Sequence, residues 1–167
     1  MPESRKTTEK ERGREAHDEV EAVADDATPG EAAFKAATYE ELDERLRLAL
    51  HAAGEKKALD LAVLDLRAIA SFTDFFLIAS GANVRQVQAI ADGVVEHLRN
   101  NLRVKPARVE GFNSAEWVLL DYGDFVFHVF EEKARRFYDL ERLWRDGERV
   151  NLPPEVSGGE GSLRTER

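Results

Sequence analysis

The chain has 167 residues, 43% of them hydrophobic, which is enough for one ordinary domain with a hydrophobic core. Its formal net charge of −9 argues against a general nucleic-acid-binding protein, because neutralising phosphates takes clustered lysine and arginine. The absence of cysteine excludes disulfides, thiolate metal sites and cysteine nucleophiles.

The composition divides the chain into a folded domain between two polar tails. Residues 1–37 carry few large apolar side chains, which predicts a disordered acidic N-terminal extension. Residues 155–167 are glycine-rich and equally polar, which predicts a flexible C-terminal tail, so the domain covers 38–154. The N-terminus lacks an apolar signal segment, and no apolar run approaches the about 20 residues that span a bilayer. We therefore expect a cytoplasmic protein with no membrane partner.

The N-terminal half of this domain alternates between helices and strands. The first predicted helix starts at Thr38, where Thr-Tyr-Glu-Glu fits a capping box, and stops at Gly54. Strands are predicted over 58–66 and 75–79, and the second is apolar throughout, as in a strand covered on both faces. Asn83 can cap the long helix that follows, which keeps its apolar period to about residue 100.

The C-terminal half is predicted to hold three short strands and a helix. One strand lies near 107–110, while 117–120 and 125–130 form a hairpin with Gly123 in its turn. A last helix runs from about Glu132 to Trp144. The resulting order, α-β-β-α-β-β-β-α, predicts an α/β sandwich with a mixed sheet.

The sequence shows no pattern typical of a catalytic or metal site. Ser80-Gly81 joins a strand to a helix, where a phosphate could bind, but no dinucleotide or Walker A motif accompanies it. His128 has no histidine partner at ligand spacing, and it is either a buried residue or part of a protein-contact face. Asp121 and Asp124 flank the hairpin turn, where aspartate commonly makes local hydrogen bonds. We expect no enzyme, no cofactor and no metal.

Five segments in order resemble the ribosomal silencing factors, the RsfS or Iojap-like family. They are TDFFLIASG at 73–81, NVRQVQAIAD at 83–92, EGFNSAEWVLLDYGD at 110–124, HVF at 128–130 and RRFYDLERLW at 135–144. The resemblance covers 38–147 and implies a fold similar to that of nucleotidyltransferases. Active nucleotidyltransferases carry an Asp-x-Asp pair after their Gly-Ser turn, and this chain has none after Ser80-Gly81. A nucleotide-binding transferase is therefore only an alternative.

The resemblance implies a translation repressor. Such factors bind the large ribosomal subunit through its ribosomal protein fourteen and block association with the small subunit when nutrients are scarce. Organelle relatives are linked to large-subunit assembly, which is an alternative role. A minor contact with ribosomal RNA and a homodimer of the free protein are further expectations.

The resemblance also implies a protein-contact site on the hairpin and the last helix. Its residues are Glu116, Trp117, Tyr122, His128, Phe130, Arg135, Arg136 and Tyr138. If Trp117 and His128 project from one face of the hairpin, they form a patch with Phe130 and Tyr122. Trp117 is expected either to anchor the interface or to pack in the core. The basic cluster of Lys133, Arg135 and Arg136 is either a solvated helix face or the rim of a contact with an acidic or RNA-rich partner.

Overall fold

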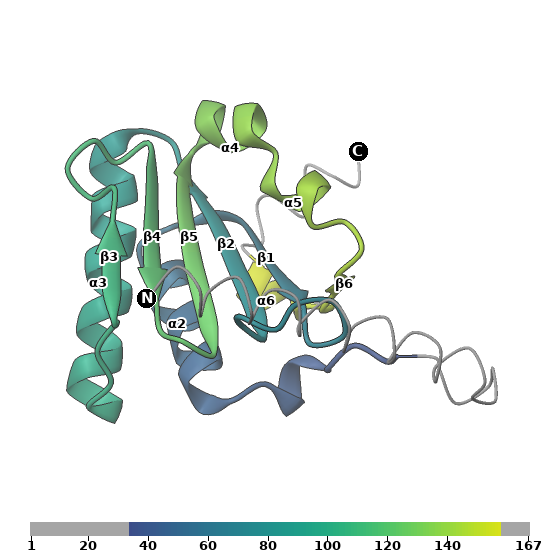
Figure 1. The fold of residues 1–167 in the computed structure, drawn as a ribbon. Helices are drawn as coiled ribbons and strands as arrows, with labels where there is room; N and C mark the ends of the chain where they lie inside the picture. Colours follow the sequence, from purple (N-terminus) through teal and green to yellow (C-terminus); the bar gives the residue numbers. More distant parts are fainter. Residues whose placement is uncertain (1–33, 158–167) are drawn as a thin grey trace, which may run out of the picture. The chain divides into compact units, whose positions relative to one another are not determined.

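A six-stranded mixed sheet forms the centre of the folded domain (Figure 1). The structure is a computed structural model and describes residues 34–157, so most of the predicted extension and tail lies outside the described residues. The strands lie in the order β3-β4-β5-β2-β1-β6, and their bounds are β1 (Leu59–Asp65), β2 (Phe75–Gly81), β3 (Arg108–Glu110), β4 (Trp117–Asp121), β5 (Phe125–Glu131) and β6 (Glu148–Arg149). The two central strands, β2 and β5, are parallel, and the other neighbours are antiparallel. The predicted α/β class with a mixed sheet is confirmed, while the similarity to nucleotidyltransferases stays a prediction.

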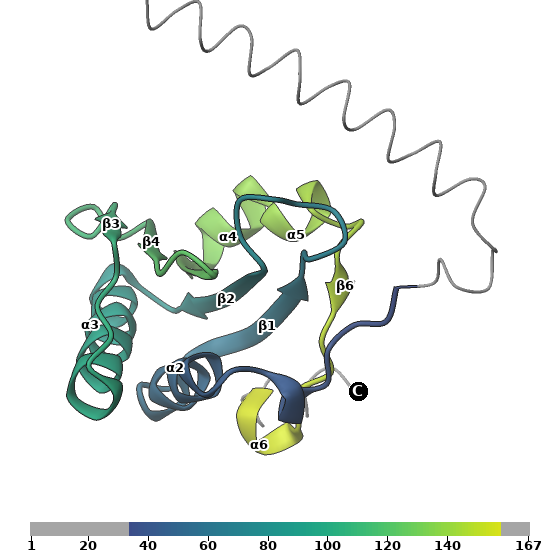
Figure 2. The ribbon, with the colours of Figure 1, turned by 60° about the horizontal axis from the view of Figure 1, so that its bottom comes forward.

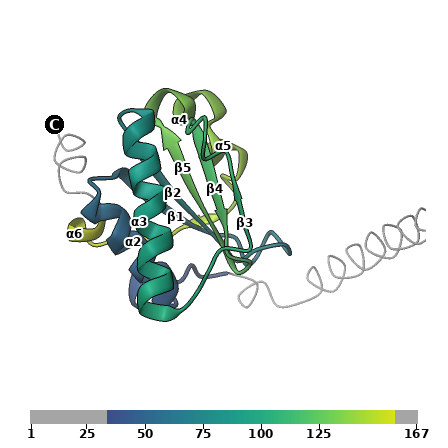
Figure 3. The same cartoon turned by 90° about the vertical axis from the view of Figure 1, so that its left-hand side faces the viewer.

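Two helices, α2 (Glu44–Glu55) and α3 (Val84–Leu102), cover one face of the sheet, as Figures 2 and 3 show. Their buried apolar stripes, which include Leu50 and Ile90, join Leu77 and other inward side chains of the strands in the larger of two cores. The cap predicted at Asn83 is present, because its side chain accepts a hydrogen bond from the Gln86 amide at 2.9 Å.

The opposite face carries the smaller core and two short helices, α4 (Glu132–Tyr138) and α5 (Leu140–Leu143). The smaller core consists of Ala62, Leu64, Leu66, Phe76, Ile78, Val126, Phe130 and Leu140. Since side chains alternate along a strand, each central strand supplies both cores, which explains why β2 and β5 read as continuous apolar runs.

The first predicted helix is in fact two elements. The capping box at Thr38 is present, but it caps the short 3-10 helix η2 (Tyr39–Glu41). Leu42 is extended, and Asp43 starts α2 by accepting a hydrogen bond from the Arg45 amide at 2.8 Å. The predicted stop at Gly54 is also wrong, since α2 continues to Glu55.

The last predicted helix is broken at Asp139, which is left-handed with φ of 49°. In a continuous helix, positions 135 and 141 would point about 120° apart around the axis, because each residue turns by about 100°. The break instead brings the two side chains together, and Arg135 Nη2 lies 2.8 Å from Glu141 Oε2. Helical periodicity alone does not reveal this corner.

Two short elements after α5 have no counterpart in the sequence prediction. β6 pairs with the end of β1, and α6 (Pro154–Ser157) packs beside α2 and β1, where Val156 contacts the larger core. The predicted boundary after residue 154 therefore cuts through α6. The boundary before Thr38 omits Ala37, which is buried and donates its amide to the Asp65 carboxylate at 3.0 Å. Within the described residues, no helix has the length and apolarity to cross a membrane.

Candidate functional site

Trp117 is held in one orientation on the sheet face that carries the smaller core. It opens β4 opposite Phe130 of β5, and the two ring centroids are 4.8 Å apart. Its indole Nε1–H donates a hydrogen bond to His128 Nδ1 at 3.0 Å, and its ring lies 4.9 Å from that of Tyr138. The side chain stays partly exposed, so Trp117 combines core packing with a surface position.

His128 is a buried acceptor for this tryptophan. Because Nδ1 accepts the indole hydrogen bond, a neutral imidazole carries its proton on Nε2, which is buried without a hydrogen-bond partner. Burial lowers the pKa of His128 to about 3, so the ring is neutral at physiological pH. Of the two expectations for His128, the buried residue is the one found. It orients Trp117 and does not itself reach solvent.

Two other predicted contact residues are not at the surface. Phe130 is fully buried beneath Trp117. Tyr122 lies on the opposite face of the sheet, in the larger core, where it stacks on Phe125 with ring centroids 4.8 Å apart. The expectation that Tyr122 joins a patch with Trp117 is therefore wrong, because side chains alternate along the strand and Tyr122 follows Val118 and Leu120 into the larger core.

The exposed members of the predicted site cluster around α4. Tyr138 is 47% exposed and its ring contacts those of Trp117 and Phe137, which is 79% exposed. We call Trp117, Tyr138 and Phe137 the aromatic ridge. Glu116 is exposed next to Trp117, and Arg136 is exposed on α4. The ridge thus runs from the start of β4 to the end of α4.

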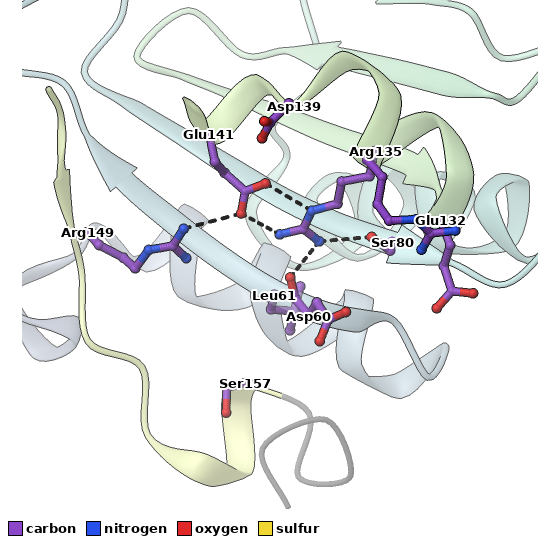
Figure 4. Close-up of a pocket in the computed structure, with 10 residues that line it drawn as sticks. Asp60, Leu61, Ser80, Glu132, Arg135, Asp139, Glu141, Arg149 and Ser157 are labelled. Atoms are coloured by element: carbon purple, nitrogen blue, oxygen red, sulfur yellow. Dashed lines mark hydrogen bonds and ion pairs between the residues drawn. The ribbon is translucent and has the colours of Figure 1, made fainter. Parts of the chain in front are cut away.

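Arg135 is a structural residue and not part of an exposed rim (Figure 4). Its guanidinium pairs with both oxygens of Glu141 and also donates to the Asp60 carbonyl and to Ser80 Oγ, at 2.6 and 2.9 Å. Burial alone would raise the pKa of Glu141, but the hydrogen bonds of Arg135 and Arg149 hold it below its usual range. This network fastens the corner between α4 and α5 to the ends of β1 and β2.

The same network lines a polar hollow of about 490 Å³ beside Ser80. The Ser80 hydroxyl, which could have faced a phosphate, is buried and accepts the hydrogen bond of Arg135. At the hairpin turn, the Asp121 carboxylate accepts a hydrogen bond from the Gly123 amide and Asp124 pairs with Arg45 of α2, so both carboxylates have partners within the domain. Among the described residues, no three His, Asp or Glu side chains form a group that could hold a metal ion.

Little in the sequence singles out Phe137 or Leu143. A continuous helix would have put both near the side that packs on the sheet, whereas the break at Asp139 leaves them 79% and 75% exposed. The one signal for the break is Asp139 itself, because aspartate adopts the left-handed conformation more often than most residues. That signal is weak, since most aspartates do not adopt this conformation. These two side chains enlarge the apolar surface around the ridge.

Comparison with known proteins adds family evidence to this geometry. The family model described as "Ribosomal silencing factor during starvation" matches residues 39–166. A ribosomal silencing factor from Halalkalibacterium halodurans is 40% identical over 114 residues, which cover 68% of this chain and 97% of the relative. The mouse protein "Mitochondrial assembly of ribosomal large subunit protein 1" is 29% identical over 92 residues, or 54% of this chain and 40% of that protein.

A solved structure shows the same fold. The crystal structure of a protein from Chromobacterium violaceum superposes with a TM-score of 0.60 at 35% identity, covering 68% of this chain and 90% of that one. The family match spans the sheet, the aromatic ridge and the Arg135 network. This chain therefore belongs to the family of ribosomal silencing factors.

Proposed function

We propose that this protein binds the large ribosomal subunit through its ribosomal protein fourteen and blocks association with the small subunit. It would thereby repress translation in the cytoplasm under nutrient limitation. The observation that carries this proposal is the aromatic ridge, which leaves Trp117 and Tyr138 accessible while a buried histidine fixes the indole. Tryptophan and tyrosine held in one orientation lose little entropy on binding, which is a property of interface hot spots.

A second role, in assembly of the large subunit, is favoured by one specific relative. The printed name of the mouse protein describes mitochondrial assembly of the large ribosomal subunit. Both roles require the same docking step, so they differ in when the protein binds and not in which surface it uses. A catalytic role has less support, because the Ser80 hydroxyl is engaged by Arg135.

Co-sedimentation with isolated large subunits tests the docking step. Trp117→Ala should weaken binding by about 30- to 1000-fold, since a tryptophan anchor commonly contributes about 2–4 kcal/mol. The free energy of unfolding should fall by only about 1–3 kcal/mol, because the ring is partly exposed. Circular dichroism checks the fold. Val84→Ala, which trims a 45% exposed side chain at the start of α3, is the control and should bind normally.

Two further measurements separate the partner from the consequence. Binding to isolated ribosomal protein fourteen tests the partner, and light scattering of mixed subunits tests the block of association. A folded Trp117→Ala protein that co-sediments at wild-type affinity would contradict the ridge as the docking site. Binding to subunits without inhibition of their association would favour the assembly role.

A further inference from the structure

The corner between α4 and α5 exposes apolar and cationic side chains together. Phe137 and Leu143 are the most exposed large hydrophobic residues that the structure describes. They border a hollow of about 590 Å³, and its lining also includes Arg136, Arg142 and Arg145. We call these five residues the arginine surface.

The three arginines of this surface are available for a partner. Among the described residues, none of their guanidinium groups makes a hydrogen bond or an ion pair, whereas the guanidinium groups of nearby Arg135 and Arg149 both bind Glu141. The Glu141 carboxylate is thus already paired with Arg135 and Arg149, on the far side of the corner between α4 and α5. The two carboxylates of the hollow, Asp139 and Asp146, form no ion pair with the three arginines. Three guanidinium groups and two carboxylates thus line the hollow, which leaves a local excess of positive charge on a chain of net charge −9.

Free guanidinium groups beside an exposed ring match the chemistry of RNA. Phosphates attract arginine with a strong salt dependence, and unstacked bases bind exposed aromatic rings. A protein partner that buried all three guanidinium groups would need carboxylates placed opposite them. An RNA strand carries one negative charge per nucleotide, so it needs no specific placement of acidic side chains.

We propose that the arginine surface binds RNA of the large ribosomal subunit, with phosphates at the three arginines and an unstacked base on Phe137. This inference rests on the proposed function, because it takes the large subunit as the partner. The arginine surface adjoins the aromatic ridge, since the rings of Phe137 and Tyr138 are 5.0 Å apart. The protein would therefore dock where a ribosomal protein and ribosomal RNA meet.

A charge-matched pair of triple variants tests the role of the arginines. Arg136→Gln, Arg142→Gln and Arg145→Gln together remove the three charges. The control, Arg47→Gln, Arg85→Gln and Arg99→Gln together, removes three exposed charges from α2 and α3. Affinity for large subunits is measured by co-sedimentation between 50 and 200 mM salt. The slope of log affinity against log salt should become shallower by about 2 in the first variant only. Over this fourfold salt range the wild-type affinity then falls about 16-fold more than that of the variant.

Isolated ribosomal protein fourteen separates this inference from the proposed function. The arginine variant should bind it as the wild type does, whereas Trp117→Ala should lose both ligands. If the arginine variant binds subunits with unchanged salt slope, or loses affinity for protein fourteen equally, the RNA contact is wrong while the docking site stands. If Trp117→Ala keeps its affinity for both ligands, the proposed docking site fails instead.

Phe137 gives an independent readout of base stacking. Phe137→Tyr keeps an aromatic ring and should keep its affinity for subunits, while Phe137→Leu should lose about 5- to 100-fold. At 79% exposure, neither change should affect folding, which thermal unfolding checks. Equal affinities for the two variants would indicate an apolar protein contact at this position and overturn the stacking on a base.

Discussion

At the scale of single residues, the hydrogen bond between Trp117 and His128 links the surface to the core. The indole donates to a histidine that is only 3% exposed, so any change at His128 should act on binding through the tryptophan. Three further members of the predicted contact set, Tyr122, Phe130 and Arg135, are likewise engaged inside the domain. The accessible contact set is therefore reduced to Glu116, Trp117, Arg136 and Tyr138, and the structure adds Phe137.

His128 should make stability depend on pH. Its folded-state pKa of about 3 lies below the value of 6.5 for the unfolded chain, so the unfolded chain takes up this proton first as pH falls. The stabilisation is fully present above about pH 6.5 and is lost toward pH 3, by about 1.4 kcal/mol per pH unit. His128→Gln keeps a hydrogen-bond acceptor but does not titrate. Between pH 7 and pH 5 it should lose about 2 kcal/mol less than the wild type in urea unfolding. Equal losses in both proteins would contradict the buried neutral histidine.

Tyr122 offers a test of burial on the opposite face. Its hydroxyl is buried without a hydrogen-bond partner, and burial raises its pKa to about 12. Tyr122→Phe removes only that hydroxyl, so the free energy of unfolding should stay the same or rise by about 1 kcal/mol. Binding to large subunits should not change. A loss of binding without a loss of stability would show that Tyr122 belongs to the contact site.

At the scale of elements, the Arg135 network determines where the aromatic ridge ends. It fixes the corner at Asp139, and that corner leaves Phe137 and Leu143 exposed while Leu140 is buried. Arg135 is fastened to three elements, namely β1 through Asp60, β2 through Ser80 and α5 through Glu141. A single side chain therefore positions both surfaces proposed to bind the subunit.

Arg135→Ala should destabilise the domain by about 2–4 kcal/mol. The change leaves the Glu141 carboxylate largely without its partner in a site where Arg135 is only 11% exposed. The neighbouring Arg136→Ala removes an exposed charge and should cost less than about 0.5 kcal/mol. Thermal unfolding distinguishes the two. If both variants had the same melting temperature as the wild type, the network would not be what holds the corner.

At the scale of the whole molecule, the folded unit reaches slightly beyond the predicted domain at both ends. A chain trimmed to residues 36–157 should keep its melting temperature within about 2 °C, because it retains Ala37 and α6. A chain trimmed to 38–154 loses the Ala37 hydrogen bond to Asp65 and the packing of Val156. It should melt about 3–6 °C lower for each kcal/mol lost. Equal melting temperatures for the two trimmed chains would show that these terminal contacts contribute nothing.

Local signals in the sequence were enough for most of the fold. The strands and the long helix follow from the apolar period, the cap at Asn83 is present, and Gly123 has a positive φ of 89° in the hairpin turn. These features depend only on residues that are close together along the chain, so they can be predicted from a single sequence. Family membership also follows from the sequence alone. Segments that match the family in the same order can be recognised without knowing which side chains are buried.

The tertiary structure alone decided which residues of the candidate site are accessible. Alternation puts His128 and Phe130 on the same strand face, but only the packing of Trp117 on both rings shows that they are buried. The break at Asp139 depends on Arg135 reaching Glu141, Asp60 and Ser80, and the last two lie 75 and 55 residues away along the chain. Such contacts leave no periodic trace in the sequence, because their free energy comes from burial and hydrogen bonding between distant segments. The sequence by itself thus determined the family and the mixed sheet, and the packing of distant segments decided which residues of the candidate site lie at the surface.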